Sequence, residues 1–212
     1  MGDYTSNLMS DRVEGIILAA GMSSRMGRPK LLIEIDGEPI ILKVTAAAAE
    51  SGLDRVTLVI GPGREDLITV LKRSRVTRDP SIIINPRPEQ GMSSSMRLGI
   101  SSINPLARGS MILLGDQPRI TPGIIDSLLR IFLQQKDKIV VPTVRSRRTT
   151  PVIFPASLFP ELMRVTGDQG GRELLKHHSD QVVEIEMGDD YDDSDVDSPE
   201  DLERIKNKHR RE

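Results

Sequence analysis

The sequence contains no cysteine and very few aromatic residues, and these two absences exclude several kinds of site. Without cysteine, the chain can form neither a disulfide nor a zinc site built from thiolates. Only 2% of the residues are aromatic, which argues against a platform on which the bases of single-stranded nucleic acid would stack. The groups left to form a functional site are therefore mainly charged side chains, hydroxyl groups and the backbone.

Long apolar runs and a strong excess of one charge are missing as well. The longest apolar stretches fall far short of the ~20 residues that span a bilayer, and the first twelve residues contain no apolar core of a signal peptide. The net charge is −2 and the pI is about 6.0, so no overall attraction to nucleic acid or membranes is expected. We expect a cytoplasmic protein whose partners include neither nucleic acid nor a membrane.

The 212 residues do contain short apolar runs that alternate with helix-like segments. Strands are expected at 13–18, 56–60, 82–84, 111–114, 139–141, 151–154 and 182–185. Strands that alternate with helices predict a mainly parallel sheet with right-handed crossovers, which binds ligands at the carboxyl ends of its strands. We expect one domain over 13–205, after a disordered lead at 1–12 and before a frayed tail at 206–212.

A glycine-rich loop follows the first strand. From Leu18 to Lys30 it reads LAAGMSSRMGRPK. Ala19 and Ala20 have almost no side chain and two glycines follow, so the backbone can approach a ligand closely and present its N–H groups. Arg25 and Lys30 add two cations to the same loop. The loop predicts a cradle for a triphosphate, although its spacing is not that of a Walker A loop.

Two further loops are expected at the same edge of the sheet. Asp116 follows an apolar strand and Gly115, and a carboxylate there, beside a phosphate cradle, is typical of a Mg²⁺ ligand. Ser93, Ser94 and Ser95 open a helix, where hydroxyls and free N–H groups can read the edge of a base or hold a phosphate. Helix capping by Ser93 or Ser94 would explain one serine but not three.

Charged clusters occur in two other places. Residues 189–197 include six aspartates, and a solvated acidic loop explains most of them, since the spacing of an EF-hand is missing. Asp195 or Asp197 is a candidate to complete the Mg²⁺ site, and Asp197 is preferred because a helix-capping segment at 198–201 should hold it still. Three arginines at 145–148 form either a solvated hairpin tip or a clamp for an anionic substrate.

Six segments, taken in order, resemble those of the molybdenum cofactor cytidylyltransferases, within the wider class of nucleotidyltransferases related to the molybdopterin guanylyltransferase. They read LAAGMSSRMGRPK, GMSSSMRLG, LGDQPRITP, RRTTPVIF, GDQGGRELL and VDSPEDL. The similarity covers about 13–205. The first segment is shared by many nucleotidyltransferases, and the later ones narrow the resemblance to this branch. The resemblance implies a Rossmann-like α/β/α sandwich of the nucleotide-diphospho-sugar transferase type, with a mainly parallel central sheet.

The resemblance also implies roles for individual residues. Arg25 and Lys30 would bind the phosphates and, with Asp116, would form the catalytic set. Asp116 would hold Mg²⁺, the expected cofactor, with Asp197 as the second ligand. The Ala-Ala-Gly form of the first loop accompanies CTP in the family, so Ala20 favours cytidine. The residues expected to contact the nucleotide are Leu18, Ala19, Ala20, Gly21, Arg25, Lys30, Gly91, Ser95 and Asp116.

The reaction that the resemblance implies is transfer of CMP from CTP to the terminal phosphate of molybdopterin, with release of pyrophosphate. A phosphate nucleophile is already ionised at neutral pH, so no general base is required. A molybdoenzyme, or the chaperone of one, would receive the product. Three alternatives stay open: another phosphorylated acceptor such as a sugar or polyol phosphate, GTP in place of CTP, and a non-catalytic cofactor carrier. Near the acceptor site, Thr149-Thr150-Pro151 replaces the Gly-His-Pro or Gly-Asn-Pro that the family often shows.

Overall fold

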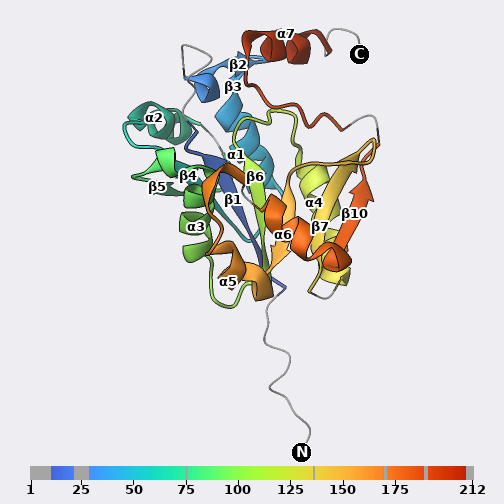
Figure 1. Cartoon of the computed structure of the whole chain (residues 1–212). Helices are drawn as coiled ribbons and strands as arrows, with labels where there is room; N and C mark the ends of the chain where they lie inside the picture. Colours follow the sequence, from blue (N-terminus) through green and yellow to red (C-terminus); the bar gives the residue numbers. More distant parts are fainter. Residues whose placement is uncertain are drawn as a thin grey trace, which may run out of the picture.

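A central sheet organises the chain. The structure is a computed structural model that describes residues 11–21, 29–74, 76–135, 137–169, 171–188 and 191–208 (Figure 1). Its main sheet has eight strands: β1 (Val13–Ala19), β4 (Arg55–Ile60), β5 (Ser81–Ile84), β6 (Gly109–Leu114), β7 (Ile139–Val144), β8 (Arg147–Arg148), β9 (Val152–Pro155) and β10 (Val182–Glu186). All seven expected strands are present, and β8 is an additional short one.

The strand order is β10-β7-β9-β6-β1-β4-β5, with β8 paired to β7. β1 is parallel to both β4 and β6, β4 is parallel to β5, and β10 is parallel to β7. β9 is antiparallel to β6 and β7, because the chain reverses at Arg145 and Ser146, whose φ angles are +50° and +62°. The predicted mainly parallel sheet is confirmed. The reversal pairs residues 147–148 with the carboxyl end of β7 and brings Thr150 beside the carboxyl end of β6.

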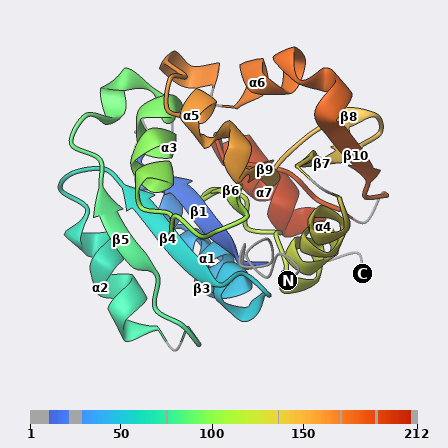
Figure 2. The same ribbon diagram turned by 90° about the horizontal axis from the view of Figure 1, so that it is seen from below.

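Helices cover both faces of the sheet (Figure 2). Side chains of β1 alternate between them: Val13 and Ile17 pack into one core, whereas Ile16 and Leu18 pack into the other. The first core is completed by α1 (Ile40–Glu50), α2 (Glu65–Arg73) and α4 (Pro122–Gln134), and the second by α3 (Met92–Ser101), α5 (Phe159–Leu162) and α6 (Arg172–His177). This arrangement confirms the predicted α/β/α sandwich.

Short elements complete the description. The 3-10 helices are η1 (Lys30–Leu32), η2 (Pro88–Gln90), η3 (Ala156–Leu158), η4 (Gly167–Gln169) and η5 (Ser179–Gln181). A small hairpin joins β2 (Glu34–Ile35) to β3 (Glu38–Pro39) through the expected turn at Asp36 and Gly37. Within the described ranges, no helix combines the length and the apolar character that crossing a membrane requires.

The final helix, α7 (Pro199–Lys208), lies above this hairpin in Figure 1. The Arg119 guanidinium connects the two, since it donates to Asp36 Oδ2 at 3.2 Å and to the carbonyl of Ile205 at 3.1 Å. Residues 206–208, which the sequence assigns to a frayed tail, continue this helix. Of the expected lead, only Asp11 and Arg12 are described, and the Arg12 carbonyl accepts a hydrogen bond from Arg108 N at 2.8 Å.

Candidate active site

The carboxyl ends of β1 and β6 lie side by side and form the base of the candidate site. Leu18 is in register with Leu114, and the N–H of Gly115 donates to the Leu18 carbonyl at 2.9 Å. Ala19 and Ala20 are buried directly at this edge, and Gly21 is exposed beyond them. Arg25 belongs to residues 22–28, outside the described part of the chain, so its predicted phosphate contact stays a prediction.

Lys30, Asp116 and Asp197 meet at this edge although they are distant in sequence. Lys30 Nζ lies 2.6 Å from Asp116 Oδ2 and 2.7 Å from Asp197 Oδ1. Lys30 starts the η1 turn, whereas Asp116 follows β6 and Asp197 precedes α7. The lysine side chain is only 13% exposed. Three of the residues assigned to phosphate and metal binding therefore form one group.

The electrostatics of this group keep Lys30 charged. Burial by itself favours the neutral amine, but the charges of Asp116 and Asp197 and their hydrogen bonds outweigh it and raise the pKa of Lys30. Asp195 lies nearby on the same segment, and burial, followed by the charges of Asp116 and Asp197, raises the pKa of its carboxyl. The edge thus combines a buried cation with closely spaced carboxylates, an arrangement suited to binding a charged ligand.

The position of Asp197 depends on the start of α7. Asp201 Oδ2 accepts hydrogen bonds from the backbone N–H groups of Ser198 at 2.9 Å and of Asp197 at 3.3 Å. The Ser198 hydroxyl in turn accepts from Asp201 N at 3.2 Å, which completes the reciprocal cap predicted for this segment. The Ser198 hydroxyl and these amides also lower the pKa of Asp201. The cap fixes the backbone on which Asp197 is carried.

The two carboxylates fit a hard divalent cation in donor chemistry. Asp116 Oδ2 and Asp197 Oδ1 already converge on one positive charge, the ammonium of Lys30, and carboxylate oxygens are the ligands that Mg²⁺ prefers. Among the described residues, no group of three or more acidic or histidine side chains has the arrangement of a metal site. A Mg²⁺ ion here would therefore need further oxygens from triphosphate and water.

The start of α3 differs from the sequence expectation. Its N-cap is Gly91, not Ser93 or Ser94, and no side chain caps the helix. Asn85, only 1% exposed, explains why the serines are there: its Nδ2 donates to Ser94 Oγ at 2.8 Å and to Ser95 Oγ at 2.9 Å. These hydroxyls anchor the loop after β5 to α3. Contact of Ser95 with a base stays a prediction.

Gly91 holds the start of α3 against the loop at 167–169. Its φ is +87° and its ψ is 176°, a combination that is essentially restricted to glycine. A Cβ there would lie 2.5 Å from Asp168 Oδ1 and 2.6 Å from the carbonyl carbon of Gly167. Asp168 Oδ1 also accepts a hydrogen bond from Met92 N at 3.1 Å. The helix and the loop are therefore in direct backbone contact.

We expect Gly91→Ala to destabilise the protein and to displace this loop. Backbone strain of this kind costs roughly 1–3 kcal/mol, and each kcal/mol lowers the melting temperature of a chain this size by about 2–4 °C. Gly123→Ala is the matched control, since a Cβ there meets nothing closer than Thr121 Oγ1 at 3.9 Å. Thermal unfolding of both variants tests the expectation, which is wrong if Gly91→Ala melts like Gly123→Ala.

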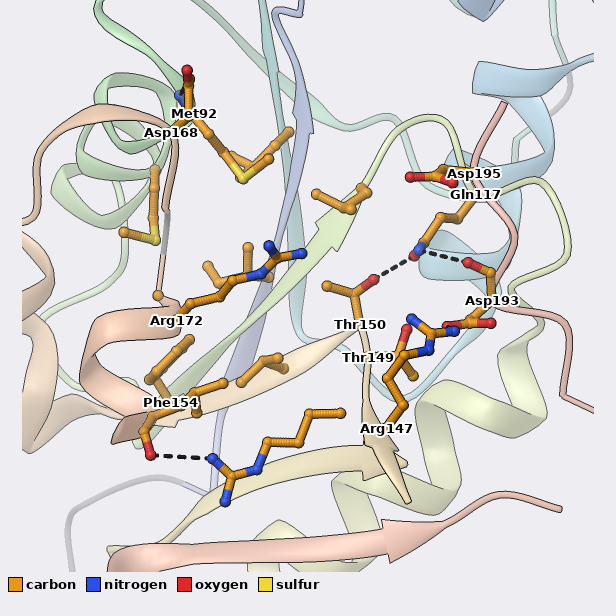
Figure 3. Close-up of a pocket in the computed structure, with 18 of the residues that line it drawn as sticks. Met92, Gln117, Arg147, Thr149, Thr150, Phe154, Asp168, Arg172, Asp193 and Asp195 are labelled. Atoms are coloured by element: carbon orange, nitrogen blue, oxygen red, sulfur yellow. Dashed lines mark hydrogen bonds and ion pairs between the residues drawn. The ribbon is translucent and has the colours of Figure 1, made fainter. Parts of the chain in front are cut away.

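A cavity of about 650 Å³ is lined by Gln117 and Asp195, which lie next to Asp116 and Asp197 along the chain (Figure 3). Its floor is apolar and comes mainly from β6 and β9, with Phe154 at one end. Its polar walls include Gln117, Thr150 and Asp195. Five cations also line it: Arg147, Arg148, Arg172, Lys176 and Arg204. The cavity combines a broad apolar surface with positive charge, and it shares Leu18 with the predicted nucleotide loop.

Two arginines of the predicted basic turn line this cavity, and both are ion-paired. Arg147 Nη2 lies 2.6 Å from Asp193 Oδ2, and Arg148 Nε lies 2.7 Å from Glu184 Oε1. They reach the cavity because β8 folds back along β7. The turn is thus more than a hairpin tip, and its role as a clamp for an anionic substrate stays a prediction.

Comparison with known proteins shows the family. The MobA-like NTP transferase domain matches residues 15–182. The chain belongs to this family. The predicted membership of the molybdopterin nucleotidyltransferase-like class is confirmed, and the protein is a nucleotidyltransferase.

Individual relatives of this MobA-like chain agree over most of its length. The purine catabolism protein PucB of Bacillus subtilis is 29% identical over 199 residues, which are 91% of this chain and 95% of that protein. The nicotine blue oxidoreductase of Paenarthrobacter nicotinovorans is 28% identical over 202 residues, 91% of this chain and 96% of that protein. The two names concern different kinds of metabolism, so these relatives do not fix the acceptor.

Solved structures agree with the fold of the MobA-like chain. Rv0371c of Mycobacterium tuberculosis superimposes with a TM-score of 0.82 at 24% identity, covering 92% of this chain and 97% of that one. Its complex with manganese superimposes with a TM-score of 0.78 at 22% identity, covering 92% and 98%. At this level of identity the likeness shows the fold, which is the predicted one.

Several residues of the candidate site in this MobA-like chain were not predicted from the sequence. Asn85 stands in a proline-containing loop, and Gln117 belongs to the run Gly115-Asp116-Gln117-Pro118 in which only the aspartate draws attention. Arg172 and Lys176 are one helical turn apart on α6, and both face the cavity. A spacing of four residues on a helix indicates that the two cations lie on the same face, but the sequence does not show that this face lines a cavity.

Proposed function

We propose that this MobA-like nucleotidyltransferase transfers CMP from CTP to the terminal phosphate of molybdopterin. The observation that carries the proposal is the cavity beside Lys30, Asp116 and Asp197, with its apolar floor and basic rim. A flat, fused-ring acceptor with a phosphorylated side chain suits it, since the rings can cover the floor while the phosphate lies toward the cations. Arg172 and Lys176 would then meet anionic groups of the acceptor.

In the proposed reaction a phosphate oxygen of the acceptor forms a bond to the α-phosphorus of CTP. The bond between that phosphorus and the oxygen bridging to the β-phosphate breaks, and pyrophosphate leaves with the electron pair. Because the nucleophile is already ionised, the residues contribute position and charge instead of accepting a proton. Lys30, with Arg25 of the predicted cradle, would neutralise the triphosphate.

A divalent cation completes the proposal, and Asp116 and Asp197 would hold it. When bound, Mg²⁺ would supply positive charge to the phosphate oxygens on which negative charge develops. The convergence of the two carboxylates on one ammonium supports this assignment, as does the manganese complex of Rv0371c. On this proposal the nucleotide loop consists of Leu18, Ala19, Ala20 and Gly21, with Gly91 and Ser95 beside the base.

The experiment that tests the proposal measures pyrophosphate release with Mg²⁺, CTP and molybdopterin, in parallel with GTP and with sugar and polyol phosphates. Fastest release with CTP and molybdopterin, with the CMP adduct detected by mass spectrometry, supports it. Faster pyrophosphate release with a smaller phosphorylated acceptor would identify that acceptor, instead of molybdopterin, as the substrate. Tight molybdopterin binding without release under any of these conditions would make the protein a carrier that hands the cofactor to a molybdoenzyme or its chaperone.

Nucleotide choice is tested separately with Ala20→Gly. Ala20 is 7% exposed, and its carbonyl lies against the position where Gly61 would carry a Cβ, so this edge is tightly packed. We expect the variant to lose part of its preference for CTP over GTP, by no more than ~1–3 kcal/mol because one methyl group is removed. The ratio of kcat/KM values for the two nucleotides measures this, with the melting temperature as the control for folding. A wild-type enzyme that uses GTP as well as CTP would contradict the assignment.

A further inference from the structure

We propose that Gln117 is a positioning residue that holds the carboxylate segment, residues 191–197, in place and links it to the wall of the acceptor cavity. The inference rests on the proposed function, because it assigns a role in the same site. Gln117 follows Asp116 directly at the end of β6. The carboxylate segment carries Asp195 and Asp197, so its path decides where these two side chains lie.

Both ends of the Gln117 side-chain amide are used, in opposite directions. Its Oε1 accepts a hydrogen bond from Thr150 Oγ1 at 2.7 Å, and its Nε2 donates to the backbone carbonyl of Asp193 at 3.0 Å (Figure 3). The residue is only 6% exposed. A buried amide group without a hydrogen-bond partner destabilises the fold. The side chain of Gln117 therefore strongly prefers the conformation that makes both hydrogen bonds.

The carboxylate segment needs such support because none of its residues belongs to a helix or strand. Besides the bond from Gln117, the N–H of Val196 donates to the Asp116 carbonyl at 3.1 Å. The hydroxyl of Tyr191 donates to the carbonyl of Thr150, and burial raises the pKa of that hydroxyl, which keeps it protonated as a donor. These hydrogen bonds all connect the carboxylate segment to the end of β6 or to Thr150.

Through its side chain Gln117 contacts both Thr150 and the backbone of the carboxylate segment. Thr150 and Asp193 line the cavity on either side of it, and Ser194 and Asp195 are the next lining residues along the segment (Figure 3). Loss of its Nε2 donor would remove the buried bond between the end of β6 and Asp193, and the exposed Arg147 would remain as a partner of Asp193. A misplacement of about 1 Å in a catalytic group can cost about 10²-fold in rate, so this single hydrogen bond affects both metal binding and turnover.

Gln117→Glu tests the role with almost no change in shape. Its carboxyl group can still accept from Thr150, but when ionised it has no hydrogen to donate to the Asp193 carbonyl. We expect turnover about 10–100-fold below wild type at pH 8. Gln117→Leu, which has neither the donor nor the acceptor, should lose at least as much.

Metal binding provides a readout that does not depend on turnover. With CTP present at pH 8, we expect the apparent dissociation constant for Mn²⁺, followed by electron paramagnetic resonance, to rise in both variants. Gln181→Glu, which makes the same chemical change next to His178 and away from the cavity, should match wild type. If the acceptor assignment fails, wild-type turnover is absent while the Mn²⁺ measurement still tests Gln117.

Wild-type Mn²⁺ affinity in both folded Gln117 variants would overturn the inference. If neither variant folds, Thr150→Val decides, because it removes only the donor to Gln117 Oε1. The inference then requires weaker Mn²⁺ binding in folded Thr150→Val, and unchanged binding refutes it.

Discussion

Asp116→Asn is expected to lower turnover by two or more orders of magnitude while the protein stays folded. The amide keeps the shape of the side chain and can still accept a hydrogen bond from Lys30, but it removes one of the two charges that would hold the metal. Metal-ion stabilisation is worth several kcal/mol in the transition state, which corresponds to about 10²–10⁴ in rate. Asp197→Asn should have a smaller effect in the same direction, since its side chain is 48% exposed.

The measurement is turnover of both variants across a Mg²⁺ titration, together with CTP binding without metal. Asp79→Asn is the control for loss of one negative charge, because Asp79 is exposed near the amino end of β5, at the opposite edge of the sheet. Normal kinetics in Asp116→Asn would remove it from the site. Normal kinetics in Asp197→Asn alone would move the second ligand to Asp195.

Lys30→Met is expected to weaken binding of CTP much more than binding of CMP. The substitution keeps the length of the side chain but removes the charge that would contact the outer phosphates, and a hydrogen bond to a charged group contributes roughly 1.5–3 kcal/mol. It also leaves Asp116 and Asp197 without the cation that now separates them, so their repulsion adds to the loss for a triphosphate. Arg25→Ala is expected to act in the same direction.

Titration calorimetry with CTP and CMP measures the difference. Lys43→Met is the matched control, since Lys43 also pairs with an aspartate, Asp36 at 3.4 Å, but lies on α1 beside the small hairpin. Equal losses for the two nucleotides in Lys30→Met would contradict a contact with the outer phosphates. Losses in Lys43→Met as large as those in Lys30→Met would indicate a general effect of charge instead.

The sheet and the Lys30 group could be predicted from the sequence because their signals are local. β1, β4 and β6 are apolar runs of strand length, and the alternation of strands with helices implies parallel pairing. That pairing places residues at strand ends together, which is why Lys30 and Asp116 could be assigned to one edge. Asp197 could be added because the cap formed by Ser198 and Asp201 is visible in the sequence.

The rest depends on long-range packing, which no local pattern reports. Ser93 and Ser94 look like helix caps, but the Ser94 hydroxyl accepts a hydrogen bond from Asn85 and Gly91 takes the cap position. The cavity exists because β9 runs antiparallel between β6 and β7, which brings Thr150 to Gln117. Such contacts depend on the order of the strands across the sheet, and this order cannot be deduced from the order of the strands along the chain.

The separation of Lys30 from Asp197 also bears on how the protein is made. The two residues are 167 positions apart, so the ribosome adds Asp197 long after the strands that form the centre of the sheet. At translation rates of about 5–20 residues per second, the delay between synthesis of Lys30 and synthesis of Asp197 is on the order of 10–30 s. Until then a nascent chain can assemble its nucleotide loop on β1 and β6 but lacks the second carboxylate. If Asp197 is the proposed second metal ligand, its late position keeps an incomplete chain from having a complete active site.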